Sequence, residues 1–247
     1  MKEDYIIKRI GKKPKLNKPV LICGLPGVGN IARIVVDFLV KKLKAKKFME
    51  VYSYTFPNTV LMKKDHSIEM PKLEFYYYKR KNKKDIVFLI GDIQPADEYD
   101  SYSFSDEILE IASSLKVSEV ITLGGIASKS DKKIVYGVHT DKKYIKKLEK
   151  LGVKFNRKGA IIIIGAAGLL LGLGDLRGIK GFSLLAETDS KISINASKEI
   201  ILILKKYLNL KIKSEHVEKE LKKIEIPVIK KKMKIDEKTK GPLTYIG

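Results

Sequence analysis

Short, continuously apolar runs recur along this chain, and segments with helical periodicity separate them. The clearest runs cover residues 19–24, 86–90, 119–125 and 182–187. Apolar runs of this length, without polar alternation, are typical of strands buried on both faces of a sheet. Behind the first run, the spacing i, i+3, i+4, i+7, i+8 of an amphipathic helix is met by Ile31, Ile34, Val35, Phe38 and Leu39. The alternation predicts an α/β fold, with a mainly parallel or mixed sheet flanked by helices on both faces.

Capping residues predict where several helices begin and end. Asn30 is expected to cap the helix just described, and Ser105 to cap a second helix that runs to about residue 115. Asp141 opens a basic helix that Gly152 ends. Residues 195–210 are predicted to form a long helix.

Three further segments favour strands. Residues 48–92 have no helical period, so we expect several strands there, with turns at 57–58 and 81–82. Residues 133–138 are expected to form another strand, and the run over 160–165 is predicted to be the most apolar strand of the sheet.

The chain has 247 residues, enough for one large domain with appendages. We expect a basic N-terminal arm over 1–18, a single α/β domain over 19–210, a charged C-terminal helix over 211–225 and a flexible, basic tail over 226–247. No apolar run reaches the roughly 18 residues that a membrane-spanning helix needs, and the N-terminal segment lacks the apolar core of a signal peptide. These features predict a cytoplasmic protein without a membrane partner.

The formal net charge of +21 raises the question of nucleic-acid binding. However, only five of the 50 basic residues are arginine, the residue suited to bidentate recognition of phosphates and bases. Abundant lysine and isoleucine are instead typical of a hyperthermophile with a charged surface. Specific nucleic-acid binding is therefore not expected. Cys23, the single cysteine, lies inside an apolar run and is expected to be a small buried hydrophobe.

A glycine-rich loop, GLPGVGN, follows the first apolar run. Residues 27–32 satisfy the dinucleotide-binding pattern G-x-G-x-x-A, and Glu50 follows at about the required distance. Residues 24–29 also match the first half of a phosphate loop, but Asn30 and Ile31 replace its Lys-Ser/Thr. Two interpretations stay open: the loop holds a phosphate, or its glycines let a helix and a strand approach closely.

The carboxyl ends of parallel strands meet at one edge of a sheet, where ligands bind. This edge should collect many glycines whose N–H groups could hold an anion, and His139 and Glu187 are expected nearby. The spacing of these residues dictates no acid–base pair, nucleophile elbow or metal site, so we expect no catalytic residues, cofactor or metal. The candidate residues of this rim are Gly24, Gly27, Gly29, Asn30, Asp92, Gly124, Gly125 and Gly168.

Taken together, the loops resemble those of the proteasome assembly chaperone family in its archaeal form. The similarity covers about residues 19–210 and rests on the ordered strings GLPGVGN, GDIQP, TLGGIA, GAAGLLLG and GDLRGIKGFSLLAET. It implies a fold similar to that of the nucleoside phosphorylases, a homo-oligomer, and a non-enzymatic chaperone or regulator that binds the α-subunits of the 20S proteasome.

Archaeal relatives are thought to dock through a C-terminal hydrophobic-Tyr-X motif. In this chain Tyr245 is third from the end rather than second, so the motif is shifted. The partner-binding residues that the resemblance implies are Leu243, Tyr245, Ile246 and Gly247. The alternative is an enzyme or sensor that binds a nucleoside or nucleotide at the glycine rim.

Overall fold

A computed structural model describes residues 4–128, 134–156, 162–189, 192–223 and 245–246. The strands of its eight-stranded sheet, in spatial order, are β1 (Tyr5–Arg9), β3 (Lys46–Ser53), β6 (Leu73–Tyr78), β7 (Ile86–Gly91), β2 (Val20–Gly24), β8 (Glu119–Ala127), β11 (Gly181–Thr188) and β9 (Val135–His139). The four central strands, β7, β2, β8 and β11, run parallel. Toward both edges the neighbours are antiparallel, so the predicted mixed sheet is confirmed.

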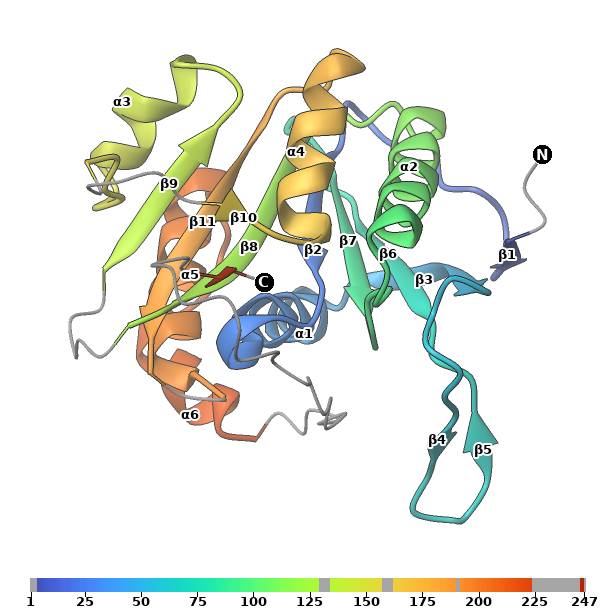
Figure 1. Cartoon of the computed structure of the whole chain (residues 1–247). Helices are drawn as coiled ribbons and strands as arrows, with labels where there is room; N and C mark the ends of the chain where they lie inside the picture. Colours follow the sequence, from blue (N-terminus) through green and yellow to red (C-terminus); the bar gives the residue numbers. More distant parts are fainter. Residues whose placement is uncertain (1–3, 129–133, 157–161, 190–191, 224–244, 247) are drawn as a thin grey trace.

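Helices cover both faces of this sheet, as predicted (Figure 1). The described helices are α1 (Ile31–Leu43), α2 (Glu98–Ser114), α3 (Lys143–Glu149), α4 (Ala166–Leu176), α5 (Ile194–Leu208) and α6 (Val217–Leu221), with the short 3₁₀ turns η1 (Val28–Asn30) and η2 (Ser214–His216). Buried residues of α1, α3, α5 and α6 share one apolar cluster. Those of α2 and α4 belong to a second cluster on the opposite face. None of the described helices is long and apolar enough to cross a membrane.

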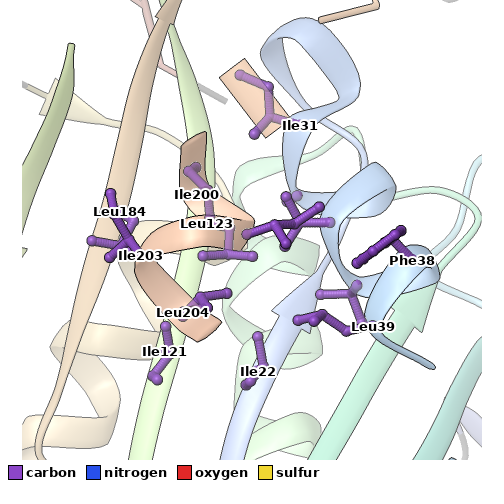
Figure 2. Close-up of a cluster of buried hydrophobic side chains, with 14 of the residues drawn as sticks. Ile22, Ile31, Phe38, Leu39, Ile121, Leu123, Leu184, Ile200, Ile203 and Leu204 are labelled. Atoms are coloured by element: carbon purple, nitrogen blue, oxygen red, sulfur yellow. The ribbon is translucent and has the colours of Figure 1, made fainter. Parts of the chain in front are cut away.

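Successive residues of the central strands contribute their side chains alternately to these two clusters. In β2, Leu21 and Cys23 contribute to the cluster of α2 and α4, whereas Ile22 contributes to the cluster of α1 and α5. Figure 2 shows Ile22 among side chains of α1 and α5, including Leu39 and Leu204. Because both faces are covered, the strand needs no polar alternation. Cys23 is buried, as predicted, and its burial raises the pKa of the thiol. The five apolar positions predicted for the buried face of α1 are also all buried.

The prediction that Ser105 caps a helix is wrong, because α2 begins eight residues earlier, which is about two turns. Asp97 caps it: its carboxylate accepts hydrogen bonds from the backbone N–H groups of Tyr99 at 2.8 Å and of Asp100 at 3.4 Å. Ser105 lies inside the helix, where its hydroxyl donates to the Ser101 carbonyl at 2.8 Å. The first buried residue of α2 is Phe104, so hydrophobic periodicity could not reveal the preceding turns.

The segment predicted to be rich in strands contains five of them, β3 to β7. The two short ones, β4 (Leu61–Met62) and β5 (Ile68–Glu69), pair as a hairpin that projects from the body (Figure 1). The turn expected at 81–82 is present, with Asn82 at φ 55°. The turn expected at 57–58 lies at residues 54–55 instead.

The run over 160–165 does not form the predicted buried strand. Residues 160 and 161 lie outside the described part of the chain, and Ile162–Ile163 form β10, which belongs to a separate two-stranded sheet. Its partner is β12 (Tyr245–Ile246), which runs parallel to it. The strand positions beside β8 and β11 are already filled, since β9 turns back antiparallel along β11. The apolar run is therefore left outside the main sheet.

The segment after α5 is anchored in the core. Val217 and Leu221 of α6 are fully buried in the cluster of α1 and α5. At the surface of the same segment, Glu218 is bonded to Lys198 at 2.8 Å. The charged residues of α6 thus lie on the outer side of this short helix, and its apolar residues face the core.

We predict that Leu221→Ala destabilises the whole domain. Truncating a fully buried leucine typically lowers the free energy of unfolding by about 2–5 kcal/mol. Lys223→Ala, two residues on and exposed, is the matched control and should change stability by less than about 0.5 kcal/mol. Denaturant-induced unfolding measures both. An unchanged midpoint for Leu221→Ala would show that α6 is not part of the cooperative unit.

Candidate functional site

The glycine loop after β2 lies against its own helix and against β8. A Cβ atom on Gly24 would lie 2.5 Å from the Cβ of Val36 in α1, so only glycine lets this helix pack so closely on the strand. Gly29 has φ 69° in the left-handed region, and a side chain there would also meet Thr188 of β11 at 3.0 Å. Both positions are explained by packing and backbone conformation.

Two more candidate glycines make room for other parts of the chain. A Cβ atom on Gly125 of β8 would come within 2.4 Å of the Val28 carbonyl oxygen, so the glycine loop rests directly on the strand. At Gly168 of α4, a Cβ atom would lie 2.7 Å from the Ile163 carbonyl oxygen. Gly124 is less crowded, with Leu185 at 3.0 Å from a built Cβ. Protein atoms therefore occupy the spaces that these glycines leave.

Asn30 stands at the N-cap position of α1, as predicted, but its side chain makes no capping hydrogen bond. Its backbone is left-handed, with φ 52°. Its N–H instead donates to the carbonyl of Gly27 at 2.9 Å, which closes the 3₁₀ turn. The backbone conformation of Asn30, and not a hydrogen bond from its side chain, therefore makes the transition from the loop to α1.

Asp92 is held by an arginine from α1. Nη1 of Arg33 lies 3.0 Å from Oδ1 of Asp92, and it also donates to the Gly91 carbonyl. The backbone N–H of Lys72 donates to Oδ2 of Asp92 at 3.1 Å. Arg33 further pairs with Asp37 at 3.7 Å; there, burial raises the pKa of the Asp37 carboxyl although Arg33 opposes the shift. Asp92 is thus engaged in fixing β7 to α1.

Gln94, the single glutamine of the chain, was not among the predicted site residues. Its Nε2 donates to the Pro26 carbonyl in the glycine loop, and its Oε1 accepts a hydrogen bond from the N–H of Ala166 at 3.1 Å. Ala166 is the first residue of α4. Backbone N–H groups at a helix N-terminus are where an anion would bind, and here a side chain from the GDIQP string takes one of them.

The cavity that remains at this place is very small. It lies between the glycine loop, Gln94, Thr122 and Gly124, and leaves ≈ 10 Å³ for a water-sized sphere. That is about the space one water molecule requires, whereas small-molecule pockets measure roughly 300–1,000 Å³. A nucleoside has no room at the rim in this conformation.

Of the two other polar candidates, His139 lies away from this edge and Glu187 lies near it. Because β9 is antiparallel to β11, His139 pairs with Phe182 at the beginning of β11, so its predicted place on the carboxyl rim is wrong. Glu187 is in register with Ile126, near the carboxyl end of β8. Among the described residues, no group of three His, Cys, Asp or Glu side chains could hold a metal ion.

Glu50, the acidic residue of the dinucleotide-binding pattern, belongs to an ion-pair cluster on β3 and β6. Lys47 Nζ lies 2.8 Å from carboxylate oxygens of both Glu50 and Glu74, and Lys72 lies 3.4 Å from Glu50. Tyr52 also donates to Glu50 at 3.0 Å. Burial disfavours the charged carboxylate of Glu50 and so tends to raise its pKa. The hydrogen bonds from Lys47 and Tyr52 and the nearby lysine charges outweigh burial and lower the pKa of Glu50 to about 2. In sheet order β3 is three positions from β2, so this carboxylate lies away from the glycine loop.

Of the tail, the structure describes only the backbone of Tyr245–Ile246. Leu243 and Gly247, the other predicted partner-binding residues, lie outside the described residues.

We predict that Glu50→Gln lowers stability at neutral pH and does so less in acid. A carboxyl whose pKa falls from 4.5 to about 2 on folding stabilises the fold above pH 4.5, by on the order of 3 kcal/mol. The difference between wild type and variant should therefore shrink as the pH falls from about 4.5 to about 2. Denaturant unfolding across this range measures it, with the exposed Glu149→Gln as control. A difference that is independent of pH would contradict the assignment.

Comparison with known proteins extends over most of the chain. The model of the PAC2 family matches residues 21–230. An uncharacterized protein of Methanocaldococcus jannaschii is 35% identical over 228 residues, which cover 90% of this chain and 87% of that protein.

Two solved structures from Pyrococcus furiosus are similar to this one. PbaB, described as an archaeal proteasome activator, has a TM-score of 0.83 and 31% identity, covering 89% of this chain and 95% of PbaB. PbaA, described as an archaeal homolog of proteasome-assembly chaperone, has a TM-score of 0.70 and 28% identity, covering 88% of this chain and 92% of PbaA. These matches confirm the resemblance that the ordered loops predicted: the chain belongs to the PAC2 family, in the branch of the archaeal proteasome assembly chaperone homologues.

Proposed function

We propose that this protein is a non-enzymatic chaperone or regulator of the proteasome that binds α-subunits, free or in the 20S particle, in the cytoplasm. The observation that carries the proposal is the similarity to PbaB, an archaeal proteasome activator, over 89% of this chain and 95% of PbaB. PbaA, a homolog of proteasome-assembly chaperone, supports the same role.

The geometry of the glycine rim supports a role in binding proteins. A catalyst or sensor for nucleotides needs a cavity and convergent polar groups, whereas the rim is packed with the chain's own backbone and with Gln94. Asp92, the carboxylate among the predicted rim residues, is paired with Arg33. No observation in the described residues favours the nucleotide-binding alternative.

The C-terminal tail is the part we expect to reach the proteasome. Twenty-one residues, 224–244, separate Lys223 from Tyr245, and a chain of that length can span up to roughly 75 Å when extended. Leu243, Tyr245 and Ile246 near its end supply apolar and aromatic side chains, followed by Gly247. Such a tip is a small anchor for an apolar pocket between subunits.

We further propose that the protein is a homo-oligomer. The β4–β5 hairpin projects from the body (Figure 1), and Val60, Met62, Ile68 and Met70 in and beside it are 52–73% exposed. Apolar side chains gathered on a projecting arm mark an interaction surface. A second copy of the chain is the partner we assign to it.

We predict that a chain truncated after Lys240 loses most of its affinity for the 20S particle. Removing the tip deletes the anchor but no described residue of the two main apolar clusters. Binding should therefore weaken at least about tenfold, or by 1.4 kcal/mol or more, while the melting temperature changes little. Co-purification and titration with archaeal 20S particles and with free α-subunits measure the loss.

Single substitutions locate the effect within the tip. Tyr245→Ala should weaken binding nearly as much as the truncation, and Thr244→Ala, its neighbour, is the matched control. Equal binding by the truncated and full-length chains would show that the tip does not contribute to proteasome binding. If the full-length chain retained neither α-subunits nor 20S particles, the proposed function itself would be wrong.

A further inference from the structure

The backbone of the C-terminal tip lies on the body of the protein. Tyr245 is in register with Ile162 and Ile246 with Ile163, in a parallel two-stranded sheet. The strand they form, β12, lies beside β8 (Figure 1). Residues far apart in the sequence, 162–163 and 245–246, thus meet beside the rim of the central sheet.

The surface under β10 is a small apolar cluster at the carboxyl ends of β8 and β11. Ile126 and Leu185 are fully buried there, and Ile163 packs against them with Tyr136 and Val138. The main clusters beneath α1 and α4 do not include these residues. The β10–β12 pair therefore covers an apolar area that the helices leave open.

β10 has the properties of an acceptor for an added strand. Within the described residues its one strand partner is β12, and the side chain of Ile162 is 55% exposed. An unpaired strand edge offers backbone N–H and C=O groups to any extended segment, and strand addition gains affinity from main-chain hydrogen bonds. A pairing of only two residues is short, so a competing site can displace it.

We propose that β10 is a storage site for the C-terminal tip of the same chain, and that the tip must leave it before the tail can engage a proteasome. This inference rests on the proposed function, because the paired residues, Tyr245 and Ile246, are among those assigned to proteasome binding. A backbone that is paired with β10 cannot at the same time occupy a pocket on another protein. Storage therefore lowers the apparent affinity for the proteasome. The apparent affinity is the intrinsic affinity multiplied by the fraction of chains whose tip is free.

A disulfide between register partners tests the storage site. In the variant Ile163→Cys/Ile246→Cys, the two positions are register partners on adjacent strands. Adjacent strands lie about 4.7–4.9 Å apart, and a disulfide typically spans Cα atoms about 4.4–6.8 Å apart. Mild oxidation should give a disulfide within one chain, seen as a monomer of altered mobility on a non-reducing gel. The oxidised protein should bind 20S particles at least about tenfold more weakly than the same protein after reduction.

A matched pair controls for random collision of the tail. Leu176→Cys/Ile246→Cys places the first cysteine at the opposite end of α4, on a side chain that is 84% exposed. This pair should form no disulfide beyond background. Ile162→Pro supplies a second test without altering the tip: proline interferes with the ladder, and the freed tip should bind 20S particles more tightly than wild type.

The outcomes separate the possibilities. No disulfide above the Leu176 control would overturn the storage site, and a disulfide between two chains would assign the edge to a second copy instead. Equal 20S binding by the oxidised and reduced forms would overturn the claim that storage blocks docking. If the intrachain disulfide forms but wild type does not bind 20S particles at all, the tip does dock on β10 and the proposed function is wrong.

Discussion

The contact between the glycine loop and β8 fixes much of this fold. The Val28 carbonyl lies where a side chain on Gly125 would have to be, and α1 approaches β2 so closely at Gly24 that Val36 leaves no space for a Cβ atom. These two close approaches set the position of α1 against β2 and β8. Gln94 then ties the loop to the beginning of α4 on the other face, so one loop joins both helical layers to the sheet.

The same contact decides what the carboxyl edge of the sheet can do. In doubly wound proteins this edge is open, and glycine N–H groups and a helix N-terminus receive a ligand there. Here the loop rests on the strand, and the space left is ≈ 10 Å³. The edge instead carries β10, β12 and a small apolar cluster. A surface of this kind is suited to peptide segments, which is compatible with the proposed role in binding proteasome subunits.

The sequence predicted the parts of this structure that depend on periodicity. The apolar runs became β2, β7, β8 and β11, and the spacing from Ile31 to Leu39 became the buried face of α1. The prediction from sequence failed where periodicity gives no information. It missed the first turns of α2, because no residue of this helix before Phe104 is buried. It also placed the apolar run around Ile162 in the main sheet, where β9 takes the position beside β11.

The candidate site was predictable only in part. The glycines could be placed at one edge because parallel strands share their carboxyl ends, but spacing could not tell a phosphate cradle from a close packing contact. Their role depends on Val28 and Val36, whose positions come from the tertiary structure. His139 was misplaced because the direction of β9 leaves no mark in its sequence. Gln94 stood out as the single glutamine, but nothing in the sequence assigned it two partners.

The most direct test of the packed rim is a calorimetric unfolding series of the wild-type chain with nucleosides, nucleotides and inorganic phosphate. A ligand present at 100 times its dissociation constant would add about 2.7 kcal/mol to the free energy of unfolding. Since protein atoms fill the spaces at Gly24, Gly125 and Gly168, no compound in the series should raise the melting temperature. A rise that saturates with concentration, and that Gly125→Ala abolishes, would show that the glycine loop opens to bind a ligand.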